Sequence, residues 1–194
     1  AACTVDANTT VTTIYFNNPG MRLTVAAGAN LALNDSGGLT LRASEDAVMD
    51  GDGTITLSTN TGENYADNQA LTGKTLTINT KITGANGFEF NGGGGTVVLA
   101  NPANDFANAV VLTGAGTLAV PSVANAGAAC PLGKGSAVKF TTTPTIFRYT
   151  GTGDSTDRAF YQNAAAGQDV TVEHAGTGTL TFTGSNTYTG GTDI

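Results

Sequence analysis

The chain has few charged residues and almost none of the residue types that carry catalysis. Only 12% of its 194 residues are charged, the eight lysines and arginines are spread singly along the chain, and the net charge is −7. Nucleic-acid binding needs a basic stripe to neutralise phosphates, so it is not expected. The single histidine, His174, ends an alternating Val-Thr-Val-Glu-His stretch. We interpret it as structural, which removes the base that a Ser-His-Asp triad would need.

Long apolar runs are also missing. No stretch approaches the ~20 apolar residues that a membrane-spanning helix requires, so no transmembrane segment is expected. Ala1-Ala2 is typical of a chain left after cleavage at a small-residue signal-peptide site. The low charge and low lysine content suit an exposed, exported surface. We therefore expect a secreted protein.

Cysteine is scarce, with Cys3 and Cys130 far apart in the sequence. An exported chain with an even number of cysteines favours a disulfide, and we expect Cys3 and Cys130 to be joined. The alternative is two free buried thiols. Neither cysteine has a second Cys or His at ligand spacing, which argues against a metal site.

Short strands and tight turns dominate what is present. The chain contains 27 glycines and many threonines and asparagines. Thr favours strands, and Gly and Asn tolerate the positive φ of tight turns, so this composition indicates many short strands joined by turns. Apolar pairs recur every ten to fifteen residues, a spacing that fits a solenoid or a sandwich. The expected inward-facing residues include Val97, Leu99, Leu118, Val120, Phe140, Leu180 and Phe182.

Internal similarity favours the solenoid. Residues 176–194 contain a short alternating strand, an Asn-marked turn, one aromatic residue and a second glycine turn. Residues 93–112 form a looser copy, in which Asn104 matches Asn186 and Phe106 matches Tyr188. Such a unit cannot bury its own apolar face, so stacked neighbours must cover it. The residues that define the motif are Gly178, Thr179, Leu180, Phe182, Gly184, Asn186, Tyr188, Gly190 and Gly191.

This motif resembles the autotransporter-associated β-strand repeat, also called the passenger-associated transport repeat. Residues 132–140 resemble the segment that often follows such repeats. The resemblance implies an all-β fold, a right-handed parallel β-helix, in an exported bacterial surface protein. We expect one elongated domain over residues 1–194, of roughly seven to ten coils, without the membrane barrel in which an autotransporter ends.

Two polar stretches, residues 58–73 and 151–167, lack a clear strand. We interpret them as excursions from the solenoid, which serve either recognition or no function. The second contains Asp154, Asp157 and Arg158. Clustered acids with one base are where a β-helix polysaccharide lyase or hydrolase would carry catalysis, although a solvated loop with a local ion pair is the simpler interpretation.

Asp50-Gly-Asp-Gly53 is the best candidate for calcium, which prefers clustered oxygen ligands. The full calcium-loop pattern fails, because Ile55 stands where a glycine is needed. A turn built from Asp and Gly accounts for the same residues. We expect no metal site, no cofactor and no catalytic residues.

Two classes of function stay open. The first is a non-catalytic surface scaffold that binds a host or cell-surface glycan or protein, or that assembles head-to-tail into a filament. The second is a carbohydrate-active β-helix enzyme. The sparse, isolated charges favour the first.

Overall fold

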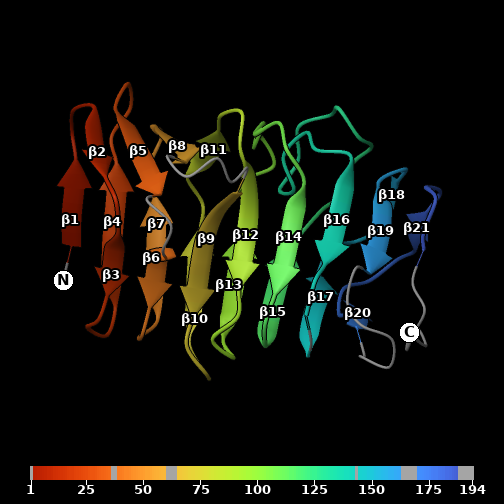
Figure 1. Ribbon diagram of the computed structural model, residues 1–194. Helices are drawn as coiled ribbons and strands as arrows, with labels where there is room; N and C mark the ends of the chain where they lie inside the picture. Colours follow the sequence, from red (N-terminus) through yellow and green to blue (C-terminus); the bar gives the residue numbers. More distant parts are fainter. Residues whose placement is uncertain (1, 36–38, 60–64, 143, 163–169, 188–194) are drawn as a thin grey trace.

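The computed structural model describes residues 2–35, 39–59, 65–142, 144–162 and 170–187. These residues form an all-β solenoid in which the described strand pairings are parallel (Figure 1). No helix occurs in the described ranges, so none there could cross a membrane. Because a strand paired in parallel with its neighbour needs a crossover, the chain must circle the axis between successive strands of one sheet.

The largest wall is an eight-stranded sheet, to which each pass of the chain contributes one strand. Neighbouring strands lie about 4.8 Å apart, so the wall grows along the solenoid axis. Its members, in spatial order, are β1 (Ala2–Val5), β4 (Met21–Val25), β7 (Ala47–Asp50), β10 (Thr75–Ile78), β13 (Thr96–Leu99), β15 (Gly116–Val120), β17 (Thr145–Tyr149) and β20 (Val170–His174).

A seven-stranded sheet forms a second wall. Its strands are β3 (Ile14–Phe16), β6 (Leu39–Ala43), β9 (Tyr65–Ala70), β12 (Gly87–Asn91), β14 (Val110–Thr113), β16 (Ala137–Phe140) and β19 (Ala159–Gln162).

The third side is discontinuous. It begins as a four-stranded sheet and resumes in the last coils as a two-stranded one. The four strands are β2 (Thr9–Val11), β5 (Asn30–Asp35), β8 (Thr54–Thr59) and β11 (Lys81–Thr83), and the two are β18 (Asp154–Thr156) and β21 (Leu180–Phe182).

The core consists of inward side chains stacked from coil to coil. Strand register places Leu23, Met49, Ile78 and Leu99 in one column, each buried. Alternation along each strand directs every second residue inward, which explains why the small apolar pairs in the sequence are enough to fill the interior. Of the residues predicted to face inward, Val97, Leu99, Leu118, Val120 and Phe140 are buried, while Leu180 and Phe182 are partly buried against the core.

Parts of the two predicted excursions lie within the walls. Tyr65–Ala70 forms β9 between β6 and β12, and residues 151–162 contain β18 and β19. The sequence pattern of β9 is polar because its inward positions include Asn68, which is buried and donates a hydrogen bond to the carbonyl of Glu89 at 3.2 Å. Residues 60–64 and 163–169 lie outside the described residues.

Candidate functional site

The third side of the solenoid is interrupted between β11 and β18, where two successive coils contribute loops and no strand. These loops are residues 101–109 and 121–136, and both lie along the upper edge of Figure 1. Without a strand ladder, their backbone groups need other partners. Side chains supply them. We call this region the loop gap.

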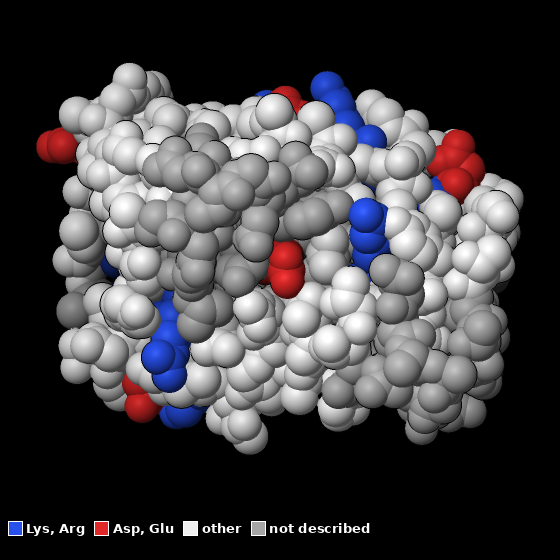
Figure 2. All heavy atoms as spheres, in the orientation of Figure 1, with Lys and Arg blue, Asp and Glu red and all other residues white. Residues whose placement is uncertain are grey.

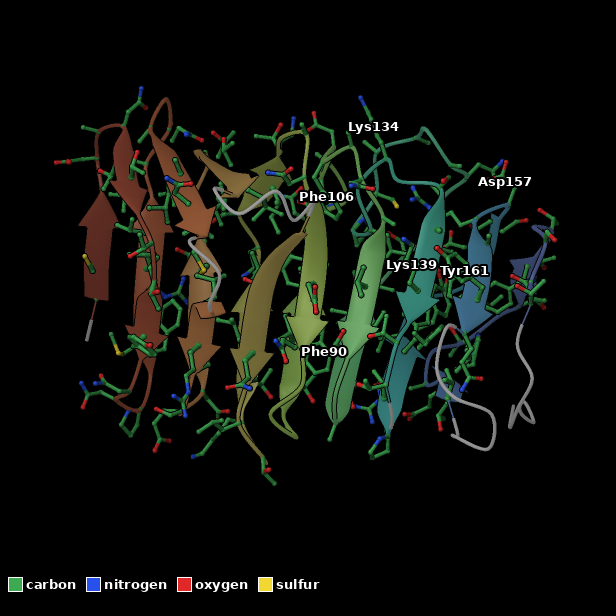
Figure 3. The ribbon with its side chains drawn as sticks, in the orientation of Figure 1. Phe90, Phe106, Lys134, Lys139, Asp157 and Tyr161 are labelled. Atoms are coloured by element: carbon green, nitrogen blue, oxygen red, sulfur yellow. The ribbon has the colours of Figure 1, made fainter. Side chains whose placement is uncertain are left out.

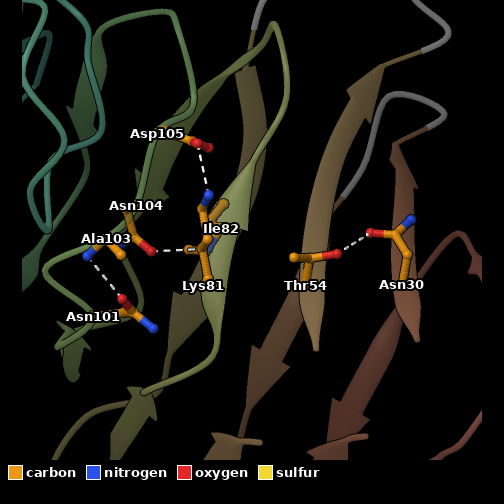
Figure 4. A network of polar contacts seen from close by, with 8 residues as sticks. All are labelled: Asn30, Thr54, Lys81, Ile82, Asn101, Ala103, Asn104 and Asp105. Atoms are coloured by element: carbon orange, nitrogen blue, oxygen red, sulfur yellow. Dashed lines mark hydrogen bonds and ion pairs between the residues drawn. The ribbon is translucent and has the colours of Figure 1, made fainter. Parts of the chain in front are cut away.

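Asn104 joins three coils across the first part of the loop gap. Its side chain is buried, and its Oδ1 accepts a hydrogen bond from the backbone N–H of Ile82 at 2.8 Å (Figure 4). Its Nδ2 donates to the carbonyl of Pro131 at 3.0 Å, and its own carbonyl accepts from the N–H of Cys130 at 3.2 Å. One asparagine thus replaces the missing strand as the link between coils.

An ion pair lies beside Asn104. Lys81 Nζ is 2.7 Å from Asp105 Oδ2, which again joins successive coils. Burial raises the pKa of Asp105, but hydrogen bonds from Lys81 and Thr83 outweigh this effect and leave the pKa below its ordinary value. Further ion pairs also link neighbouring coils: Arg22 with Asp50, Lys74 with Glu45, and Arg148 with Glu173.

Arg158, which lies between β18 and β19 in the next coil, holds the loop of residues 121–136. Its side chain is fully buried. A fully buried arginine usually forms an ion pair with a carboxylate, and Arg158 forms none with the described residues. Burial lowers the pKa of Arg158, an effect that the Cys130 thiol and the Asp157 carboxylate oppose. The guanidinium donates to the Sγ of Cys130 at 3.4 Å and to backbone carbonyls of Ala124 (2.9 Å), Asn125 (3.4 Å), Ala128 (3.2 Å), Gly133 (2.7 Å) and Gly135.

Asp154 and Asp157 complete the anchorage. Asp154 Oδ2 accepts hydrogen bonds from the N–H of Val123 at 3.0 Å and from the hydroxyl of Tyr149 at 2.8 Å. Asp157 Oδ1 accepts from the N–H of Ala126 at 2.7 Å. The three residues singled out as a possible acid–base cluster therefore bind the neighbouring loop. The expected solvated ion pair is also wrong, because Arg158 is buried and donates to carbonyls.

The other sequence candidates lie elsewhere. Asp50 pairs with Arg22 and accepts a hydrogen bond from Thr24 at 2.9 Å, while Gly51 has a φ of 105° and would place a Cβ 2.1 Å from the Val25 carbonyl oxygen. This is a glycine-dependent corner between two walls. No group of three or more potential metal ligands occurs in the part of the chain that the structure describes. His174 points inward, with its ring centroid 5.4 Å from that of Tyr149.

The predicted disulfide between Cys3 and Cys130 is absent, and both cysteines are free. Cys3 is exposed in β1, whereas Cys130 is buried in the loop that follows β15. Those two strands are five steps apart in the eight-stranded sheet, or about 24 Å along the axis. A disulfide needs Cα atoms within about 7 Å, so this fold keeps the two thiols apart.

The repeat motif is described from Gly178 to Asn186. Asn186 Oδ1 accepts the N–H of Phe160 at 3.0 Å, which parallels the contact between Asn104 and Ile82 and agrees with their match in sequence. Gly178 has a φ of 78°, and Leu180 and Phe182 pair with Asp154 and Thr156. Thr179 precedes β21 and Gly184 follows it, whereas Tyr188, Gly190 and Gly191 lie outside the described residues.

The loop gap presents an exposed segment of small and polar residues. Residues 125–129, with the sequence Asn-Ala-Gly-Ala-Ala, are exposed, and Lys134 extends outward from the same loop (Figure 3). Charged side chains on the face shown in Figure 2 are scattered and form no extended patch. The sequence analysis did not single out residues 121–136, because no residue within this loop indicates that Arg158 of the next coil would bind it.

Comparison with known proteins adds one relative. The chain is similar to the adhesin BmaC autotransporter of Brucella suis biovar 1 (strain 1330), with 33% identity over 180 residues. The match covers 86% of this chain but only 5% of that protein. No family model and no solved structure matches the chain. The similarity and the solenoid together fit a passenger-like β-helix of the autotransporter type.

Proposed function

We propose that this chain is a segment of an exported autotransporter passenger and serves as a non-catalytic, adhesin-like scaffold at the surface of a bacterium. The observation that carries the proposal is the parallel solenoid, together with 33% identity to an adhesin. The scaffold would present its surface, including the loop gap, to a glycan or protein on another cell. Its repeat would belong to the autotransporter-associated class.

The use of Asp154, Asp157 and Arg158 as anchors supports a non-catalytic role. Arg158 is buried, and both carboxylates accept backbone hydrogen bonds, so they hold a loop and leave little freedom to act on a substrate. The competing proposal is a carbohydrate-active enzyme. Turnover of a polysaccharide or ester substrate that Asp154→Asn or Asp157→Asn abolished, while leaving the fold intact, would favour the enzyme.

Adhesion is tested directly with beads coated with the purified chain. We expect such beads to bind mammalian cell monolayers several-fold more than beads coated with albumin or with the heat-denatured chain. Equal binding by all three coatings would contradict the adhesin role.

Head-to-tail association is a separate part of the proposal. In the first coil, Val5, Val11 and Ile14 pack only partly against the core, so an added coil could cover them. Light scattering over a range of concentrations tests this. Growth in mass with concentration would support filaments, and a constant monomer mass would argue against them.

A further inference from the structure

A hollow of about 290 Å³ lies on the outer face of the eight-stranded sheet, where β4, β7 and β10 run side by side. Gly20, Arg22, Asp46, Val48, Thr75 and Thr77 line it. It lies on a different wall from the loop gap.

The hollow follows from the strand register. Arg22, Val48 and Thr77 face outward in one row across the three strands. Two residues before each of these, Gly20, Asp46 and Thr75 form a second row, in which Gly20 and Asp46 directly precede β4 and β7. Gly20 has no side chain, and a Cβ placed there would meet no atom within 4 Å. The missing side chain opens one corner of an otherwise filled surface.

The hollow carries charges of both signs. Arg22 pairs with Asp50, and its side chain is still 55% exposed. Asp46 Oδ1 accepts the backbone N–H of Thr75 at 2.8 Å. Because Arg22 and Asp46 bring charges of opposite sign to the hollow, it favours neither an anion nor a cation, whereas guanidinium N–H groups can donate to a neutral hydroxyl oxygen and carboxylate oxygens can accept from one.

Two hydroxyls and an apolar floor complete the hollow. The side chains of Thr75 and Thr77 line the hollow, and a hydroxyl group can both donate and accept a hydrogen bond. Val48 lies in the middle of its row and offers an apolar surface. Hydroxyl-bonding groups around an apolar centre match a sugar ring, which carries hydroxyls on its rim and C–H groups on its face.

We propose that this hollow binds one sugar unit of a neutral glycan. The inference rests on the proposed adhesin function and assigns that function a ligand class and a site. The site is shallow and has no aromatic platform among its lining residues, so the affinity for a single sugar is expected in the roughly millimolar range.

NMR titration of the isotope-labelled chain with mannose, galactose, glucose and N-acetylglucosamine tests the site. We expect at least one sugar to shift the amide signals of Val48, Thr75 and Thr77 saturably. Thr77→Val should weaken the affinity for that sugar about five-fold or more, and Thr77→Phe should abolish binding because the phenyl ring fills the hollow. Thr171→Val, at an outward position on β20, is the matched control and should bind like the wild type.

Three results would overturn the inference: no saturable shift with any of the four sugars, an equal loss in Thr171→Val, or an equal response to glycerol. The bead assay separates this inference from the proposed function. If Thr77→Phe still mediates adhesion but no longer responds to any sugar, the adhesin role is supported and the hollow is rejected as its glycan site. A sugar response without adhesion keeps the site and rejects the role.

Discussion

The guanidinium group of Arg158 donates a hydrogen bond of 2.7 Å to the carbonyl of Gly133, 25 residues earlier in the chain. It is one of several bonds from the same buried group to one loop. Desolvating a cation is costly, and here carbonyl dipoles, together with the Cys130 thiol and the Asp157 carboxylate, compensate much of that cost. The chain thereby fixes a loop that has no strand ladder to order it.

Arg158→Met should release this loop. The buried carbonyls of Gly133 and Gly135 would lose their donor, each at about 1–3 kcal/mol, and three part-buried carbonyls would lose theirs as well, so we expect a loss of about 3 kcal/mol or more in the free energy of unfolding. Urea denaturation measures the loss, and hydrogen exchange should show it first in residues 121–136. Arg148→Met is the control, because Arg148 forms a partly exposed pair with Glu173 and should cost about 1 kcal/mol or less. Equal losses in the two variants would argue against the anchoring role.

Asn104→Ala should also be strongly destabilising. The substitution leaves the N–H of Ile82 and the carbonyl of Pro131 without partners in the interior, at a total of about 2–4 kcal/mol. Asn101→Ala serves for comparison, since its contacts to Asn79 and Ala103 are exposed and water can replace them. We expect it to cost about 1 kcal/mol or less. Thermal or urea unfolding of both variants would reveal whether Asn104 carries the link between coils.

The two cysteines should behave as independent thiols. In the native chain, a thiol reagent should modify exposed Cys3 quickly and buried Cys130 only after unfolding. Mass spectrometry after labelling counts the modified thiols in each state. Electrophoretic mobility should be the same with and without reductant. An intact mass lower than that of the reduced chain by two hydrogen atoms would instead indicate a disulfide between the two thiols.

The solenoid was predictable because each short strand carries the same alternating apolar pattern, and that pattern repeats from coil to coil. Alternating pairs such as Val97 with Leu99 and Leu118 with Val120 define inward columns, and Asn104 was identified as a corner from its match to Asn186. The loop anchorage was not predictable, because a lone arginine among two aspartates suggests a solvated ion pair. Only the stacking of coils shows that Arg158 points inward toward carbonyls of the previous coil. β9 was not predicted for a similar reason: the polar residue Asn68 occupies one of its inward positions, so the strand lacks a regular apolar pattern.

The last prediction concerns alkaline pH and the pair formed by Tyr149 and Asp154. Burial raises the pKa of Tyr149 above its ordinary value of 10.0, and the hydrogen bond to Asp154 raises it further. The folded state therefore favours the neutral phenol. Its contribution to stability is fully present below the unfolded pKa and is lost as pH rises through the higher folded value.

We therefore expect the free energy of unfolding of the wild type to fall more steeply above pH ~10 than that of Tyr149→Phe. At neutral pH, Tyr149→Phe should cost about 1.5–3 kcal/mol, the range for a hydrogen bond to a charged group. Urea denaturation at a series of pH values measures both effects. Parallel pH curves for the two proteins would show that Tyr149 ionises as freely in the folded chain as in the unfolded one.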